Sequence, residues 1–225
     1  MTTREPLTAI VPIKHNSARV PGKNLRPFAG LPLFHHILDA LESSTLIDMI
    51  VVDTDSEDIA RSVAESRPHV TVLPRPSHLA QPETPMNDVL EHTIAQLAGD
   101  FFLQAHTTSP LLTAPTIDSA IEAFWAHWPT HDSLFSVSKK QERLWSRKGV
   151  PLNHDPQVLL PTQDLEPFFV ENSCLYVFNR DVFLDHSSRI GSRPYLFETP
   201  DLESIDIDVE SDFIIGEAIA SRDVS

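Results

Sequence analysis

Short apolar segments rich in β-branched residues alternate with amphipathic helical patterns along the first half of the chain. The segments are residues 7–12, 48–53, 70–73 and 101–104, and each has the length and composition of a buried strand. Apolar residues recur at helical spacing over residues 33–41, after a capping Ser56, over residues 86–97 and over residues 113–125. Strands that alternate with helices form right-handed βαβ units. The alternation therefore predicts an α/β fold of three layers with a mainly parallel sheet.

The alternation stops after about Lys139. The next stretch, as far as Phe169, is irregular and contains prolines, which is typical of a segment outside a sheet. We interpret residues 139–169 as an inserted arm or lid. Residues 173–178 and 204–208 have the pattern of further strands, and residues 211–220 have that of a closing helix. A length of 225 residues fits a single domain over residues 1–225 that carries this arm.

The composition limits the partners and the compartment. The chain has 17 Lys and Arg against 32 Asp and Glu, a formal charge of −15, so nucleic acid and anionic membrane surfaces should repel it. We expect neither as a partner. Cys174 is the single cysteine, which excludes an intrachain disulfide and a multi-cysteine metal cluster. The opening residues lack the apolar core of a signal peptide and no run reaches membrane-spanning length, so we expect a soluble, cytoplasmic protein.

The sign of the charge is unevenly distributed. No Asp or Glu occurs from Pro6 to Leu38, although the average composition would place about five there. The same stretch holds Lys14, Arg19, Lys23 and Arg26. The pattern favours a cradle for a small anion, and the alternative is a solvated basic loop.

Ligands of α/β sheets bind outside the carboxyl ends of the strands, which directs attention to the loops after Val11, Val52, Leu73 and Gln104. The six glycines form neither a G-x-G-x-x-G nor a G-x-x-x-x-G-K-[ST] pattern. A dinucleotide-binding Rossmann site and a P-loop are therefore not expected.

The loop after the first strand has the groups that a triphosphate needs. Residues 12–25 have the sequence PIKHNSARVPGKNL, which combines backbone N–H groups, the Ser17 hydroxyl and several cations. A lysine is a mobile point charge that can follow a leaving pyrophosphate. The run resembles the signature P-A-R-x-x-S-x-R/G-x-P-x-K-N of the sugar-activating cytidylyltransferases, which include the acylneuraminate (CMP-sialic acid) and CMP-KDO synthetases.

The resemblance continues in order through most of the chain. Six further segments resemble family patterns. Residues 52–60 resemble STD-x-x-x-I-A, residues 75–80 resemble R-P-x-x-L-A, and residues 108–111 resemble T-S-P-L. Residues 132–137 resemble D-S-x-x-S-V, residues 172–176 resemble N-G-x-x-Y, and residues 204–213 resemble D-I-D-x-x-x-D-F. The resemblance implies a Rossmann-like nucleotidyltransferase domain and the transfer of CMP from CTP to an acidic acceptor, with release of pyrophosphate. It also implies that the arm, residues 139–169, reaches across a homodimer.

Asp206 and Asp208 form a second constellation. In a strand, the period of two would put both carboxylates on one face, with Ile205 and Ile207 on the other. Two carboxylates beside substrate phosphates are hard oxygen ligands of the kind that Mg²⁺ prefers. We therefore predict that Asp206 and Asp208 bind Mg²⁺, and the alternative is a solvated acidic edge. Asp212 is more consistent with a partner of the helix dipole than with a ligand.

The resemblance assigns roles to single residues. Asn24, Arg75 and the loop 79–86 would contact cytosine, although Arg75 could equally be a surface residue between two prolines. Lys23, Lys14 and Arg19 are the predicted catalytic residues, with Lys23 expected to neutralise the leaving group. The predicted nucleotide-binding residues are Pro12, Ile13, Lys14, Ser17, Lys23, Asn24, Arg75, Thr84 and His106.

The acceptor side departs from the sialate pattern. Lys14 occupies the position of a common arginine, Leu112 replaces an arginine after T-S-P-L, and basic residues are absent from 160–165 and 171–173. We favour a nonulosonic or 3-deoxy-ulosonic acid as the acceptor, with a small phosphonate second. Predicted acceptor contacts are Arg143, His154, Gln163, Asp164, Glu171 and Asn172.

Two other functions share these features. A nucleotidyltransferase that uses UTP or GTP would keep the first loop but need a different base-reading loop. A non-catalytic nucleotide-binding protein of the same fold would lack the metal pair, so Asp206 and Asp208 argue against it.

Overall fold

The first half of the chain alternates strands and helices as the sequence predicts. The computed structural model describes residues 4–15, 17 and 19–222, so the opening residues 1–3 and residues 16 and 18 of the predicted phosphate loop lie outside the described residues. The major elements are β1 (Leu7–Ile13), α1 (Leu33–Ser43), β4 (Met49–Thr54), α2 (Glu57–Ser66), β5 (Thr71–Pro74), α3 (Met86–Ile94), β6 (Phe101–Ala105) and α4 (Ala114–His127). Short elements lie between them: η1 (Lys23–Leu25), β2 (Pro27–Phe28), β3 (Leu31–Pro32) and η2 (Ser77–Leu79).

Local capping explains where some of these helices begin. The Ser56 side chain accepts a hydrogen bond from the backbone N–H of Ile59, and Glu57 and Asp58 lie in the first turn of α2. Both features favour a helix N-terminus, because they satisfy a free N–H group and complement the helix dipole. The prediction of a cap at Ser56 is confirmed. Helix α3 ends at Ile94, three residues before the predicted end.

The second half contains β7 (Ser133–Lys140), η3 (Thr162–Asp164), β8 (Phe168–Asn179), α5 (Arg180–His186), β9 (Pro194–Glu198) and α6 (Glu210–Ala220). The prediction of a strand over residues 204–208 is wrong, because residues 205–208 have no regular secondary structure. The N–H of Ile207 donates to the loop carbonyl of Thr108 (2.8 Å) instead of to a sheet ladder. Helix α5 and strand β9 were not predicted from the sequence, and β9 is the edge strand beside β7.

The described strands form a seven-stranded sheet in the order β5-β4-β1-β6-β8-β7-β9 and a separate hairpin of β2 and β3. Strands β5, β4, β1 and β6 are parallel to one another. Strand β8 is antiparallel to both β6 and β7, whereas β7 and β9 are parallel. Leu175 of β8 pairs with Ala105 at the carboxyl end of β6. Residues that precede Leu175 therefore lie at the end of the sheet where the parallel strands have their carboxyl ends.

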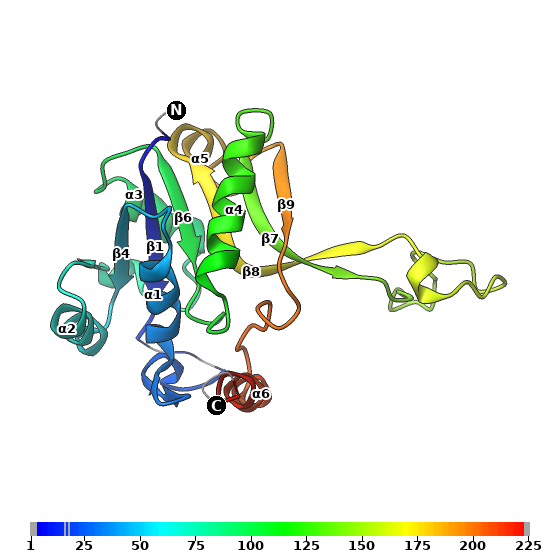
Figure 1. Ribbon diagram of the computed structural model, residues 1–225, viewed down its shortest axis with the longest axis horizontal. Helices are drawn as coiled ribbons and strands as arrows, with labels where there is room; N and C mark the ends of the chain where they lie inside the picture. Colours follow the sequence, from blue (N-terminus) through cyan, green and yellow to red (C-terminus); the bar gives the residue numbers. More distant parts are fainter. Residues whose placement is uncertain (1–3, 16, 18, 223–225) are drawn as a thin grey trace.

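Helices cover both faces of the sheet, so the three-layer prediction is confirmed (Figure 1). On one face, α1, α2 and α4 pack on alternate strand residues such as Leu103 and Val177. On the other face, α3 and α5 pack on Phe102, Tyr176 and Phe178. Burial of both faces explains why the central strands are continuous apolar runs. None of the described helices is long and apolar enough to cross a membrane.

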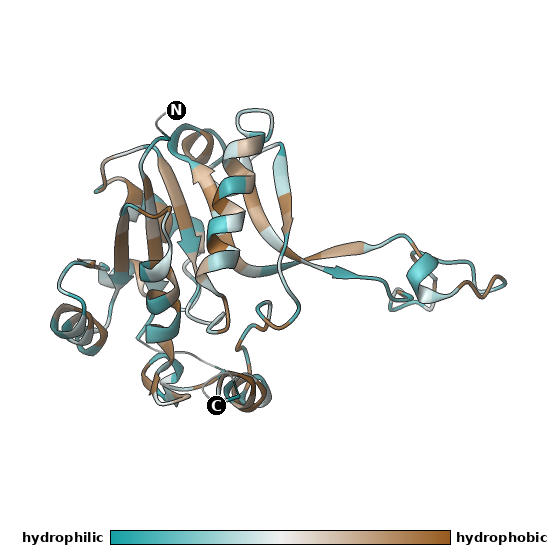
Figure 2. Ribbon diagram, viewed as in Figure 1, coloured by the Kyte–Doolittle hydropathy of each residue, from teal (hydrophilic) through white to brown (hydrophobic). Residues whose placement is uncertain are grey.

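Residues 141–167 leave the sheet between β7 and β8 and form an arm that projects away from the rest of the molecule (Figure 1). Strands β7 and β8 stay paired where they leave the sheet. Lys139 and Phe169, the first and last residues of the predicted arm, are paired with each other in these strands. Hydrophobic segments lie along the arm (Figure 2). Leu159 is 82% exposed, and Val150, Leu152 and Val158 are more than half exposed. Such a surface is unusual for a monomer.

Asp132 ties the start of β7 to the segment before β9. Its carboxylate accepts hydrogen bonds from the backbone N–H groups of Ser192 and Arg193 (3.1 and 3.0 Å) and from the Ser192 hydroxyl (3.0 Å). Burial raises the pKa of Asp132, but these bonds outweigh it and leave that pKa below its ordinary value of 3.8. The folded state is therefore stabilised by the ionised carboxylate.

We predict that Asp132→Asn lowers the free energy of unfolding at pH 7 by about 1–3 kcal/mol, because the charged acceptor of several partly buried hydrogen bonds is lost. The contribution is complete above pH 3.8 and is lost as the pH falls through the lower pKa of the folded state. Urea titrations of both proteins between pH 7 and pH 3 measure the difference. The exposed Asp185→Asn is the control, and an equal loss in that variant would contradict the prediction.

Candidate functional site

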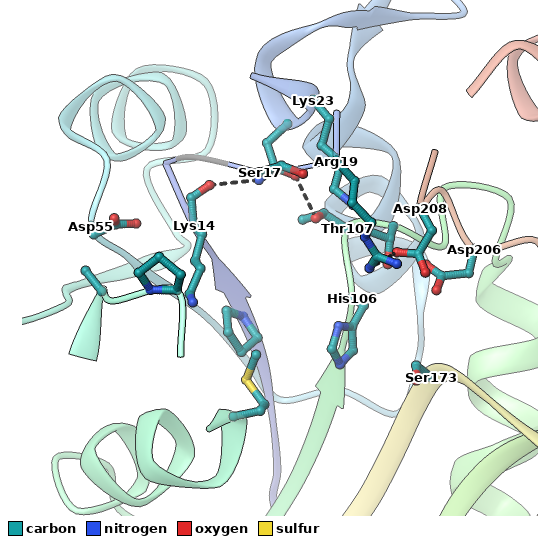
Figure 3. Close-up of a pocket in the computed structure, with 16 residues that line it drawn as sticks. Lys14, Ser17, Arg19, Lys23, Asp55, His106, Thr107, Ser173, Asp206 and Asp208 are labelled. Carbon is teal, nitrogen blue, oxygen red and sulfur yellow. Dashed lines mark hydrogen bonds and ion pairs between the residues drawn. The ribbon is translucent and has the colours of Figure 1, made fainter. Parts of the chain in front are cut away.

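A cavity of about 830 Å³ opens at the carboxyl ends of β1 and β6. The structure brings nine of the predicted site residues together around it (Figure 3). They are Pro12, Lys14, Ser17, Arg19, Lys23, Asn24, His106, Asp206 and Asp208. The other lining residues are Asp55, Ala80, Pro82, Met86, Thr107, Thr108 and Ser173.

The basic loop after β1 is anchored to β6 through Asn24. The Asn24 amide donates to the backbone carbonyl of Lys14 (2.9 Å), and its Oδ1 accepts from the Thr107 hydroxyl (2.8 Å). Both partners, Lys14 and Thr107, line the cavity. Asn24 is buried, and the structure gives it this anchoring role within the protein.

Each of the three cations in the loop has a protein partner. Lys14 Nζ donates to the carbonyl of Gln81 (2.8 Å), which joins the first loop to the segment after β5. Arg19 is paired with Asp208 (2.5 Å). Lys23 Nζ donates to the carbonyl of Ile207 (2.7 Å). Burial, with a contribution from Arg19, lowers the pKa of Lys23, and Asp206 and Asp208 oppose that shift.

Ile207 positions the two aspartates. Its side chain is fully buried in an apolar cluster with Phe28, Leu33 and Phe213. Its N–H and C=O are bonded to the Thr108 carbonyl and to Lys23 Nζ. Asp206 and Asp208, the residues before and after Ile207, both line the cavity, as the alternation predicts, although no strand forms.

Helix α6 continues from this anchored segment. Asp212 Oδ2 accepts from the backbone N–H groups of Asp208 (3.0 Å) and Val209 (2.9 Å). Asp212 lies in the first turn of α6, where a carboxylate stabilises a helix. Arg26 pairs with Glu210 (2.6 Å) and lies over the Phe213 ring (3.9 Å to the centroid). These contacts attach α6 to the loop that carries the cations.

Asp206 and Asp208 have the chemistry of a divalent-cation site. Asp206 Oδ1 is buried and has no hydrogen-bond partner in the described part of the chain. Burial and the charge of Asp208 raise the pKa of Asp206, and a hydrogen bond with Thr108 opposes this. An unpartnered carboxylate oxygen beside a second carboxylate suits a hard cation. The described residues contain no cluster of three or more His, Cys, Asp or Glu ligands, so further ligands would come from substrate or water.

Three predicted nucleotide-binding residues do not line the cavity. Ile13 is fully buried in the core. Thr84 closes a turn with its N–H bonded to the Gln81 carbonyl (3.2 Å). Arg75 is not a surface residue, because its side chain is inaccessible to solvent and paired with Asp53 (2.5 Å). Its NH1 atom has no hydrogen-bond partner in the described part of the chain, so one donor of this buried guanidinium remains available.

None of the six predicted acceptor residues lines the cavity of its own chain. Arg143, His154, Gln163 and Asp164 lie on the arm, where Arg143 donates to the Leu160 carbonyl and His154 packs on Trp145. Glu171 and Asn172 lie on β8. Glu171 accepts from the Tyr176 hydroxyl, and Asn172 donates to the hydroxyls of Ser138 and Thr199 (3.1 and 2.6 Å).

Ser173 lines the cavity in their place. It has φ of 59°, a conformation that is uncommon for residues other than glycine. The related pattern N-G-x-x-Y has glycine at this position, so the departure from that pattern was a usable signal. Asp55 and Thr107 were also missed. Asp55 follows β4 and accepts from the His15 N–H (2.7 Å), and the position after a parallel strand was its signal.

The fold and the cavity define an α/β protein with a ligand-sized cavity at the carboxyl ends of its parallel strands. A family model described as Cytidylyltransferase matches residues 8–215. The chain belongs to this cytidylyltransferase family.

Among relatives, N-acylneuraminate cytidylyltransferase of Streptococcus agalactiae serotype III is 28% identical over 212 residues, covering 91% of this chain and 51% of the relative. CMP-N,N'-diacetyllegionaminic acid synthase of Legionella pneumophila is 30% identical over 233 residues, covering 95% of each chain. This chain therefore spans about half the length of the Streptococcus relatives and nearly all of the Legionella relative.

Solved structures support the fold. A CMP:2-keto-3-deoxy-manno-octonic acid synthetase complexed with CTP superposes with a TM-score of 0.72 at 12% identity, covering 97% of this chain and 99% of that chain. A 4-diphosphocytidyl-2C-methyl-D-erythritol synthase from Anaerococcus prevotii gives a TM-score of 0.69 at 12% identity, with the same coverage.

The Arg19–Asp208 pair competes with any cation for the same carboxylate. Both side chains are partly exposed, so the pair is worth only about 0.2–1 kcal/mol. We predict that Arg19→Gln increases the affinity of the nucleotide-free protein for Mn²⁺ by about 1.5- to 5-fold. Electron paramagnetic resonance of free Mn²⁺ measures this binding without turnover.

The control is Arg61→Gln, which breaks an exposed pair with Asp58 on α2. Asp206→Asn and Asp208→Asn should both weaken Mn²⁺ binding. Unchanged affinity in both aspartate variants would mean that the carboxylates form a solvated acidic edge.

Proposed function

We propose that this chain transfers CMP from CTP to a small acidic acceptor and releases pyrophosphate. The observation that carries the proposal is the convergence of Lys14, Arg19 and Lys23 with Asp206 and Asp208 in one cavity, in a member of the cytidylyltransferase family. Cations suit the phosphates, and paired carboxylates suit the metal that accompanies a nucleotide.

The reaction needs positioning and charge neutralisation rather than a covalent intermediate on the protein. An acceptor oxygen attacks the α-phosphorus in line, the bond from that phosphorus to the bridging oxygen breaks, and pyrophosphate leaves. Lys14, Ser17 and Arg19 hold the phosphates. Lys23 neutralises the leaving group, because its ammonium lies deep in the cavity beside both aspartates.

Asp206 and Asp208 are the residues that would hold Mg²⁺. The ion would supply polarisation of the α-phosphate and acidify the attacking hydroxyl. The support in this chain is the unpartnered, buried Asp206 Oδ1 and the proximity of Asp208. Arg19 leaves Asp208 when the phosphates arrive and pairs with them instead.

The base is read at the side of the cavity formed by the ends of β4 and β5. Ala80, Pro82 and Met86 provide apolar surface there, and Asp55 provides an acceptor. Arg75 does not line the cavity and supports this region from within the protein, through its buried pair with Asp53. Cytosine is the base we propose, on the strength of the family.

The favoured acceptor is a nonulosonic or 3-deoxy-ulosonic acid. The names of the Streptococcus and Legionella relatives support this class. A small phosphonate is the second candidate, because none of the predicted acceptor-side basic residues lines the cavity within one chain.

A pyrophosphate-release screen tests the function. We expect CTP to support turnover better than UTP or GTP with at least one of N-acetylneuraminate, KDO and 2-aminoethylphosphonate. Lys23→Ala should slow that turnover by about 10²–10³-fold, because a charge-assisted contact to the leaving group is lost in the transition state. Better turnover with UTP or GTP would contradict the donor assignment. A Lys23→Ala variant with normal kcat would contradict the role of Lys23.

The arm gives the proposed homodimer. Four predicted acceptor residues lie on the arm, and they can reach a cavity only if that cavity belongs to a second copy. The exposed apolar side chains of residues 150–160 provide the contact surface. We expect light scattering to give a dimer for the intact chain, and a Gly-Ser linker in place of residues 141–167 to give a monomer. A monomeric intact chain at working concentration would remove the proposal.

A further inference from the structure

The order of the strands gives the cavity two different ends. Strands β4 and β5 lie on one side of β1, and β6 and β8 lie on the other. The basic loop follows β1, so the phosphates occupy the middle. Asp55 lies toward the β4 side, and His106 and Ser173 lie toward the β8 side (Figure 3). With the base on the β4 side, the acceptor end is the end bordered by His106 and Ser173.

Arg189 sets the orientation of the Gln104 side chain. Arg189 NH1 lies 2.6 Å from Gln104 Oε1, and a guanidinium can only donate. The oxygen of the Gln104 amide must therefore face Arg189. Its NH₂ group then faces His106, with Gln104 Nε2 2.7 Å from His106 Nε2.

The Gln104 amide in turn sets the tautomer of His106. An NH₂ group donates, so His106 Nε2 is the acceptor and the ring proton lies on Nδ1. Arg189 NH1, 3.4 Å from the same Nε2, adds a second donor on that side. Nδ1 makes no hydrogen bond within the described part of the chain, and the ring lines the cavity. Burial, Arg189 and Lys23 lower the pKa of His106 to about 3, which keeps the ring neutral.

Arg189 is held by the side chains around it. Its guanidinium stacks on the Tyr176 ring (3.5 Å to the centroid) and lies 3.9 Å from Glu171. Its side chain is 15% exposed, and the residue does not line the cavity. Arg189 therefore acts through Gln104 and His106 rather than by contact with a ligand.

Ser173 completes the acceptor end. Its left-handed backbone conformation and its place in β8 direct the side chain to the cavity, and the Tyr176 hydroxyl lies 3.2 Å from its Oγ. The Tyr176 hydroxyl donates both to Glu171 and to Ser173 Oγ, so Ser173 is the acceptor in this contact. The Ser173 hydroxyl is free to donate to a ligand.

We propose that His106 Nδ1–H and the Ser173 hydroxyl are the specificity-determining donors for an oxygen of the acidic acceptor, with Arg189 as the positioning residue that fixes the His106 tautomer through Gln104. This inference rests on the proposed function for the identity of the ligand. The buried charge of Arg189 makes the acceptor end favourable for an anion.

The tautomer is measured on the nucleotide-free protein. Two-dimensional ¹H–¹⁵N correlation spectra distinguish Nδ1–H from Nε2–H imidazole, and His106→Gln identifies the signal. We expect Nδ1–H in the wild type. Arg189→Met releases the Gln104 amide and should give a mixture of both tautomers, while Arg189→Lys keeps a donor and should retain more of the Nδ1–H form.

Kinetics test the contact with the acceptor. For each of N-acetylneuraminate, KDO and 2-aminoethylphosphonate that turns over, Ser173→Ala and His106→Phe should each raise the acceptor KM by about tenfold or more, since a donor to a charged group is lost. The KM for CTP should change less than about twofold. His106→Gln retains an N–H donor and should recover part of the loss. Ser119→Ala on α4 and His69→Gln, both exposed and away from the cavity, are the matched controls.

The outcomes separate the two proposals. An Nε2–H or doubly protonated His106 in the wild type would overturn the inference, as would variants that raise the KM for CTP and leave that for the acceptor unchanged. A wild-type protein that neither binds CTP nor releases pyrophosphate would overturn the proposed function, and with it the acceptor role of both residues. The tautomer measurement decides the Arg189–Gln104–His106 linkage in either case.

Discussion

The site depends on one peptide unit, that of Ile207. Its N–H is bonded to the end of the β6 loop at Thr108, its C=O accepts from Lys23, and its side chain is buried among Phe28, Leu33 and Phe213. Three parts of the chain that are distant in sequence meet at this residue. The consequence is that a loop without secondary structure holds two carboxylates as firmly as a strand would. Loss of the Ile207 side chain would therefore displace the aspartates and the lysine together.

The same packing balances charge in the cavity. The chain carries a large negative charge overall, yet three cations, Lys14, Arg19 and Lys23, line the cavity beside three carboxylates, Asp55, Asp206 and Asp208. The carboxylates stabilise the buried charge of Lys23, and Lys23 stabilises theirs. An incoming triphosphate with its metal would exchange these internal pairs for intermolecular ones, so little uncompensated charge is buried at any stage. Acidic residues on the rest of the surface do not prevent a triphosphate from binding, because salt screens their charge beyond about 10 Å.

The sequence predicted the parallel half of the sheet, the helices of that half and most of the first-loop residues that line the cavity. These depend on local periodicity and on one loop whose residues are contiguous. Residues 204–208 have the alternation of a strand, but β9 occupies the edge of the sheet, and which segment pairs there is a tertiary choice that periodicity does not encode. Arg75 was assigned to the surface as an alternative, although its partner Asp53 lies 22 positions earlier and buries it. Neither pairing leaves a signal at the residue itself.

The acceptor end was the least predictable part, for a physical reason. Gln104 and His106 come from β6 and the loop after it, Ser173 and Tyr176 from β8, and Arg189 from the segment after α5. No contiguous motif contains the whole set. In the proposed contact, the group that meets the ligand is the ring proton on His106 Nδ1. Arg189, which does not line the cavity, fixes the position of that proton through Gln104. Substitutions of Arg189 can therefore change the hydrogen-bonding character of the site while every lining residue stays the same. If the proposal holds, acceptor preference depends on residues behind the cavity, such as Arg189 and Gln104, as well as on the residues that line it. Similarity of the lining residues to those of relatives therefore does not identify the acceptor.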